Sequence, residues 1–301
     1  MSELWKLIRF VKPYWQKSLL SMVLLIAVVI MDLAIPRLVQ RIIDEGINQQ
    51  NMDVVVQTSL VMFAISILNM VLAIGNNNFS VQVGESVARD LREALFLKIQ
   101  SFSFGNLDQL KTGQLLVRLT SDASVFQRLV QVSLRIGSRA PLLMIGSIIL
   151  MFNTDRTLAL TIVPILIVTS LIMGFFIVRM GGLFRTALLK LDQLNNVLQE
   201  NIAGVRVVKS FVRAGFEKER FGAANQDYTD RHIRVMQFMS TMSPALTVFL
   251  NIGIVVVIWA GGLQSMRGEL TTGQIVAFVN YLQTTMGPLM IMVMVANVVA
   301  A

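Results

Sequence analysis

Long apolar runs, separated by polar segments of very unequal length, dominate the chain. An α-helix needs about 20 apolar residues to cross the hydrocarbon core of a bilayer, and six runs come close to this length. They are residues 19–38, 54–79, 136–152, 158–178, 242–263 and 273–298. Because backbone amides in lipid must be paired within their own segment, all six runs are predicted to be transmembrane helices.

Two of the connections between the runs are much longer than the others. Residues 80–135 and 179–241 are charged, yet leucines recur at helical spacing in the second of them, from Leu183 to Leu198. We therefore predict helices that continue beyond the bilayer, by roughly 40 Å at about 1.5 Å per residue. A passive pore has no obvious need for such arms, whereas a machine driven by a partner on that side does.

Composition and charge support a membrane protein and orient it. Hydrophobic residues make up 54% of the chain, charged residues only 15%, and the mean hydropathy is +0.66. The N-terminal segment and the two long connections, counted with Arg139 just beyond the end of the first connection, hold 22 of the 26 Lys and Arg residues. The positive-inside rule places these segments and both termini in the cytoplasm, and we expect a multi-pass protein of a cell membrane, the bacterial inner membrane. The formal net charge of +8 then requires no nucleic acid as a partner.

The sequence divides into an interfacial segment, residues 1–17, and a transmembrane domain, residues 18–301. Residues 1–15 alternate apolar and basic positions, which predicts an amphipathic helix lying at the membrane surface. The chain has no cysteine, no Gly-Lys dipeptide of a phosphate-binding loop, and no visible catalytic set or metal-binding cluster. We expect no cofactor on this chain and no binding or hydrolysis of ATP by it.

Three polar segments carry a resemblance to a known family. Residues 108–122 read DQLKTGQLLVRLTSD, close to the Thr-Gly-Glu-Leu…Arg-Leu-Thr-Asn-Asp pattern of that family's first intracellular loop. Residues 195–211 and 268–278 match its second intracellular loop and the entry to its sixth helix, and Asp44 and Gly46 also fit. With these segments in order among six apolar runs, essentially the whole chain resembles the transmembrane domain of an ATP-binding cassette exporter of the multidrug and lipid type.

The resemblance implies an all-α fold of six transmembrane helices with long cytoplasmic extensions and two short coupling helices, at 112–123 and 211–218. The coupling helices would dock on a nucleotide-binding domain, which uses ATP and Mg and is absent from this chain. The residues assigned to this contact are Thr112, Gly113, Gln114, Arg118, Asp122, Phe211, Arg213, Phe216 and Glu217. Ordinary helices of solvated loops are the alternative. Because fused motors are usual in the family, we favour truncation over a separate motor polypeptide.

Candidate substrate contacts lie within the apolar runs. Asp32 is the one ionisable group well inside a run, where a carboxylate costs about 2.5–3.5 kcal/mol, so it faces protein or water. It either contacts cationic substrates or makes a structural hydrogen bond to a neighbouring helix. The other candidates are Asn76, Phe249, Asn251, Asn280, Gln283, Met286 and Met290. Methionine suits surfaces that accept varied apolar ligands, and ordinary helix packing with polar contacts is the alternative.

The predicted function is therefore a half-transporter that pairs with a second transmembrane half, as a homodimer or heterodimer. Driven by nucleotide-binding domains that are not in this chain, it would export a small lipophilic, drug-like or lipid substrate across the membrane by alternating access. Two other classes remain open. An ion-coupled secondary transporter would show buried charge chains and repeats, and a membrane receptor or scaffold would bind a signalling partner with its cytoplasmic arms.

Overall fold

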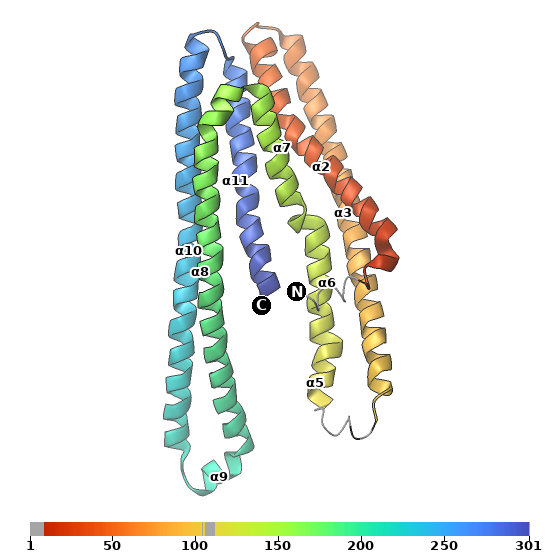
Figure 1. Cartoon of the computed structure of the whole chain (residues 1–301), viewed down its shortest axis with the longest axis vertical. Coiled ribbons are helices and arrows are strands. Elements are labelled where there is room, and N and C mark those ends of the chain that lie inside the picture. Colours follow the sequence, from red (N-terminus) through yellow and green to blue (C-terminus); the bar gives the residue numbers. More distant parts are fainter. Residues whose placement is uncertain (1–8, 104, 106–111, 301) are drawn as a thin grey trace. The chain divides into compact units, whose positions relative to one another are not determined.

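The computed structural model describes residues 9–103, 105 and 112–300, excluding the side chains of residues 286 and 288–300. Every regular element in this part of the chain is helical (Figure 1), so the all-α prediction is confirmed. The α-helices are α2 Trp15–Arg41, α3 Met52–Gln100, α5 Thr112–Val117, α6 Ala123–Val132, α7 Arg139–Thr154, α8 Arg156–Ala203, α9 Val205–Ser210, α10 Ala214–Met266 and α11 Thr272–Ala300. The short elements are the 3-10 turn η1 Lys12–Tyr14 and the π-helical turns η2 Ile42–Ile47, η3 Arg118–Asp122 and η4 Ser133–Gly137.

Five helical stretches among the described residues are long and apolar enough to cross a membrane. They are Lys12–Ile47, Met52–Gln100, Thr112–Thr154, Arg156–Ala203 and Ala214–Met266. The chain is therefore a multi-pass membrane protein. The sixth predicted run falls on α11, a helix of 29 residues, but the count of six spans stays a prediction.

Three helices are much longer than a membrane is thick. α3, α8 and α10 contain 49, 48 and 53 residues. At about 1.5 Å per residue each is roughly 70–80 Å long, against about 30 Å for the hydrocarbon core. Each of the three helices contains most of an apolar run and continues far into a polar segment, so the prediction of helical extensions is confirmed.

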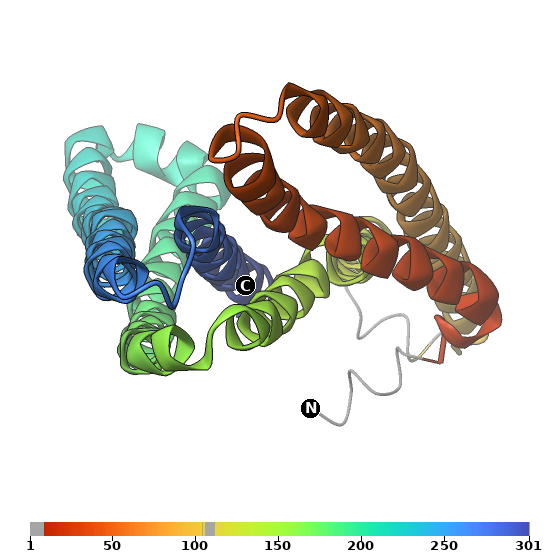
Figure 2. The ribbon, with the colours of Figure 1, turned by 90° about the horizontal axis from the view of Figure 1, so that it is seen from above.

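The chain packs as two units, of which the first comprises residues 1–161 and 254–299. Within it α2 and α3 lie side by side, and α11 lies next to α7, where the hydroxyls of Ser147 and Thr285 are 2.6 Å apart (Figure 2). The part of α3 that follows its apolar run, from residue 80 onward, packs on α6. Val83, Val87 and Leu91 of α3 are buried there against three apolar residues of α6, Ala123, Phe126 and Val130.

A hydrogen-bonded cluster ties the start of α2 to the extension of α3. The Tyr14 hydroxyl donates to Asp90 over 2.6 Å, and Arg89 donates to Tyr14 over 2.9 Å and pairs with Asp90. Burial raises the pKa of Asp90, but the hydrogen bonds from Tyr14 and Arg89 outweigh it and hold that pKa below its usual range. Of the predicted interfacial segment, residues 1–8 lie outside the described residues, and residues 12–14 form the single 3-10 turn η1.

The entry to α11 is capped twice. Thr271 and Gln274 form a capping box, in which the Gln274 N–H donates to the Thr271 hydroxyl and the Thr271 N–H donates to Gln274 Oε1. From η2, Asp44 accepts a hydrogen bond from the Gly273 N–H over 2.9 Å and one from the Thr271 hydroxyl over 2.5 Å. A carboxylate at a helix N-terminus is favoured by the helix dipole, so Asp44 stabilises this junction between η2 and α11.

The second unit, residues 162–253, is an antiparallel pair formed by parts of α8 and α10 and joined by α9 (Figure 1). Met180, Ala187 and Val235 are buried between the two helices. Further along, Lys190 donates to Asp227 over 2.9 Å, and this hydrogen bond lowers the pKa of the Asp227 carboxyl. The pair is exposed, so its contribution to stability is small.

Candidate functional site

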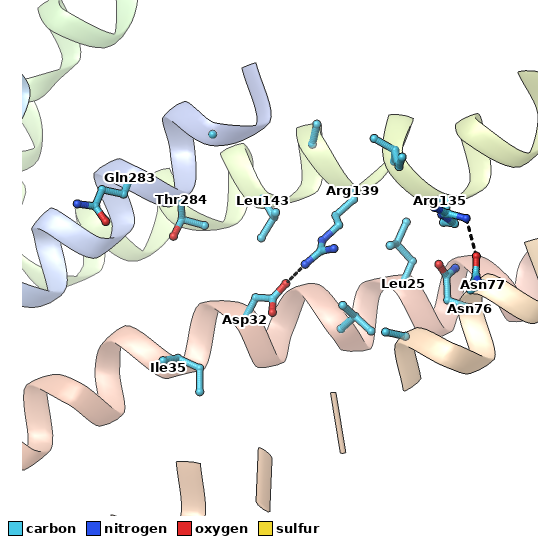
Figure 3. Close-up of a pocket in the computed structure, with 15 residues that line it drawn as sticks. Leu25, Asp32, Ile35, Asn76, Asn77, Arg135, Arg139, Leu143, Gln283 and Thr284 are labelled. Atoms are coloured by element: carbon cyan, nitrogen blue, oxygen red, sulfur yellow. Dashed lines mark hydrogen bonds and ion pairs between the residues drawn. The ribbon is translucent and has the colours of Figure 1, made fainter. Parts of the chain in front are cut away.

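A pocket of about 1000 Å³ opens within the first unit between α2, α3, η4, α7 and α11 (Figure 3). This volume lies at the upper end of the range of about 300–1000 Å³ for small-molecule sites. Its wall combines an apolar part with polar and charged side chains. The polar and charged residues are Asp32, Asn76, Asn77, Arg135, Arg139, Gln283 and Thr284.

Asp32 has a partner at each carboxylate oxygen. Asn69 Nδ2 on α3 donates to Oδ1 over 2.7 Å, and Arg139 Nη2 on α7 pairs with Oδ2 over 2.8 Å. The side chain is 23% exposed, so a lone carboxylate would be costly here, and both partners offset that cost. The structural hydrogen bond to a neighbouring helix is therefore present, and Asp32 also lines the pocket.

Asn76 holds α3 against α2. Its side chain is buried, and its Nδ2 donates to the carbonyl oxygen and the hydroxyl of Ser21 over 2.8 and 2.9 Å. Polar contacts of this kind are how transmembrane helices associate without a hydrophobic driving force. Asn76 thus belongs to the packing of the pocket wall, which it also lines.

Replacing Asn76 with leucine is expected to lower the unfolding free energy by about 0.6–1.7 kcal/mol, the range found for such contacts between membrane helices. The Ser21 hydroxyl and carbonyl lose their donor. The thermal midpoint of the purified protein measures this loss. Asn78→Leu, at an exposed position on the same helix, is the matched control, and an equal loss in both variants would contradict the assignment.

The other predicted cavity residues divide into three groups. Gln283 lines the pocket with Asp32 and Asn76. Asn280 instead donates to the Val276 carbonyl of its own helix, over 3.0 Å. Phe249 and Asn251 belong to the second unit and are half-buried and exposed respectively, and the side chains of Met286 and Met290 lie outside the described residues.

The pocket residues that sequence reasoning missed include both of its arginines, Arg135 and Arg139. In the sequence both count only toward the positive charge of the first long connection and its end. Arg139 is the first residue of α7, and Arg135 lies in the π-helical turn before it. Two arginines spaced by four at the edge of an apolar run were the available signal, because i and i+4 share a helix face.

The two ends of the helical extensions that lie farthest from the apolar runs are called here the first tip, residues 112–122, and the second tip, residues 201–217. At the first tip, α5, η3 and α6 follow each other in one helical stretch that continues to α7, Thr112–Thr154. The predicted coupling residues of this region, Thr112, Gly113, Gln114, Arg118 and Asp122, are all exposed. Residues 106–111 lie outside the described residues, so the part of the motif before Thr112 does too. A docking role for this tip stays a prediction.

At the second tip the predicted helix 211–218 is wrong. The short helix is α9, Val205–Ser210, and it ends in a turn before α10 begins at Ala214. The Arg213 N–H donates to Val208 O and the Val212 N–H to Lys209 O, the pattern of a Schellman turn. Val212 takes the left-handed position, with φ 52°, where glycine is usual and a β-branched residue is disfavoured.

This turn presents aromatic side chains to solvent. Phe211 is 73% exposed and Phe216 57%, and Arg213 is exposed beside them. Glu217 differs from the other predicted contact residues, because it accepts a hydrogen bond from Asn201 over 3.1 Å and its side chain is only 15% exposed. Glu217 therefore ties α10 to α8 within the tip.

Residues 18–289 match the family model of the ABC transporter transmembrane region. The chain belongs to this family. Among relatives, it is 32% identical over 288 residues to the ABC transporter ATP-binding protein YfiB of Bacillus subtilis, covering 94% of this chain and 50% of that protein. It is 30% identical over 274 residues to an ABC transporter ATP-binding protein of Mycobacterium tuberculosis (90% and 47%), and 23% identical over 282 residues to an export ATP-binding/permease protein of Rickettsia bellii (92% and 48%).

This ABC transporter transmembrane domain spans about half the length of the curated relatives that it matches. The matched range contains the pocket, the junction at Asp44 and both tips. The recognition made from residues 108–122, 195–211 and 268–278 is confirmed at the level of the family.

Proposed function

We propose that this chain is the transmembrane half of an ATP-driven exporter of lipophilic, drug-like or lipid substrates. The observation that carries the proposal is that a chain of this family has helices roughly 70–80 Å long, more than twice the thickness of the hydrocarbon core. Helices that long reach a partner well outside the membrane. The proposed partners are nucleotide-binding domains, which use ATP and Mg, and a second transmembrane half.

The tips would transmit the movement of those partners. When two nucleotide-binding domains close on ATP, the exposed residues around Phe211 and those of 112–122 would move with them. A continuous helix transmits such a displacement along its axis, because its backbone hydrogen bonds resist bending. The transmembrane helices would then shift between two packings, one open to each side of the membrane, and substrate binding would bias their balance.

The proposed orientation has the tips and both termini in the cytoplasm, and the distribution of basic residues supports it. In inverted membrane vesicles the tips would then face the external buffer, where ATP is added. The natural gene product in such vesicles is expected to accumulate a lipophilic fluorescent dye when ATP is present. A non-hydrolysable ATP analogue should support no accumulation.

The same vesicles separate this proposal from an ion-coupled transporter. Dissipating the proton and sodium gradients should leave ATP-dependent accumulation unchanged. Accumulation that needs no ATP and is abolished when the gradients are dissipated would overturn the proposal.

A further inference from the structure

The pocket between α2, α3, η4, α7 and α11 carries a positive charge that has no acidic partner. The ionisable side chains in its wall are Asp32, Arg135 and Arg139. Asp32 and Arg139 pair over 2.8 Å and neutralise each other, and the second oxygen of Asp32 accepts from Asn69. A cationic ligand would have to displace a guanidinium from that carboxylate, so the pocket does not favour cations.

Arg135 supplies the remaining charge. Its Nη1 donates over 2.6 Å to Oδ1 of Asn77, a neutral amide (Figure 3). No carboxylate pairs with it among the side chains that the structure describes. An arginine carries five N–H donors in a planar fork and stays charged at every physiological pH. The donors that Asn77 does not use suit an oxyanion, which a guanidinium binds through two parallel hydrogen bonds.

The rest of the pocket offers an apolar wall next to this charge. Leu25, Val28 and Ile35 follow one face of α2, since they are spaced by three and seven, and this stripe is about 15 Å long. Ala140 and Leu143 of α7 line the pocket as well. Figure 3 shows Arg135 and Asn77 at one end of the view and Ile35 and Gln283 towards the other.

We propose that this pocket binds amphiphiles whose head group is an oxyanion, such as a phosphate ester or carboxylate. Arg135 holds the head group, Asn77 positions Arg135, and the stripe on α2 covers the apolar tail. Arg135 precedes the third apolar run by one residue, so the head group would lie at the membrane boundary and the tail towards its core. This inference rests on the proposed export function and names the class of its substrate.

The test compares two amphiphiles with the same tail and opposite charge. Dodecyl phosphate and dodecyltrimethylammonium are titrated, without ATP, into the natural protein held in phosphatidylcholine nanodiscs. Dodecyl phosphate is expected to bind more tightly. Arg135→Gln should weaken its binding by roughly tenfold or more, the value of a hydrogen bond to a charged group.

Two further variants make the test specific. Asp32→Asn releases Arg139 from its ion pair, so it should bind dodecyl phosphate at least as tightly as the wild type does. Arg128→Gln changes an exposed arginine of α6 outside the pocket and should leave binding unchanged. If a membrane lipid is the natural ligand, phosphatidylglycerol in the nanodisc will compete with dodecyl phosphate. If the ligand is a soluble amphiphile, phosphatidylglycerol will not compete.

Three results would overturn the assignment. In the first, Arg135→Gln binds dodecyl phosphate as tightly as the wild type does. In the second, the wild type binds dodecyltrimethylammonium as tightly as dodecyl phosphate or more tightly, and Asp32→Asn abolishes that binding. In the third, the wild type binds inorganic phosphate as tightly as dodecyl phosphate. Because binding is measured without ATP, these results are distinguishable from a failure of ATP-dependent export in vesicles.

Discussion

Replacing Gly273 with valine is expected to destabilise the protein more than any other single change considered for the first unit. A Cβ at this position would lie 2.6 Å from the Gln40 carbonyl oxygen and 2.7 Å from the Asp44 carboxyl. Since the carbonyl is backbone, α11 would have to move away from α2 and η2. Overpacking costs about 1–3 kcal/mol, and loss of the hydrogen bond from Gly273 to the Asp44 carboxylate adds about 1.5–3 kcal/mol.

The thermal midpoint of the purified protein and the yield of folded material measure this effect. Gly262→Val is the matched control, because a Cβ at Gly262 in α10 meets nothing within 4 Å. Valine there replaces a poor helix former, so Gly262→Val should be neutral or slightly stabilising. A Gly273→Val protein that unfolds at the wild-type temperature would show that α2 and α11 do not meet as described.

Phe211→Ala is expected to reduce ATP-dependent transport by about thirtyfold or more. If the second tip docks on a nucleotide-binding domain, Phe211 is its most exposed aromatic residue, at 73%, and aromatic anchors of interfaces cost about 2 kcal/mol or more when truncated. Because the side chain makes little contact within this chain, the variant should fold normally. Transport in inverted vesicles and the thermal midpoint together separate coupling from folding.

Leu189→Ala provides the comparison for Phe211. Leu189 is 56% exposed on α8, outside the tip, so its removal should leave transport near the wild-type rate. Equal transport by the Phe211 and Leu189 variants would remove Phe211 from the contact with the motor.

The helices were predictable because each segment repeats the same signal many times. Apolar runs marked the spans, and the leucines from Leu183 to Leu198 marked the extension of α8, which is continuous to Ala203. The break at the second tip was not predictable in the same way. It depends on one backbone conformation at Val212, a residue type that rarely takes it, while Gly215, the more obvious breaker three residues later, lies inside α10.

The candidate site was predictable only as a set of separate residues. The cost of burying a charge singled out Asp32, but its partner Arg139 is 107 positions away in sequence. Their contact depends on how α7 packs on α2, which no local pattern encodes. The contact between Asp44 and Gly273 is similar, because both had been noted as parts of one family pattern, and only the fold shows that they touch.

The link from Asp44 to Thr271 and Gly273 has a mechanical consequence. It gives η2, at the end of α2, and the first turn of α11 one shared fulcrum. If the angle between α2 and α11 changes, their separation must grow with distance from this point. Gln283 and Thr284 lie some ten residues along α11, about 15 Å from this point. They would therefore be displaced when the angle changes, while the residues around Asp44 stay nearly still.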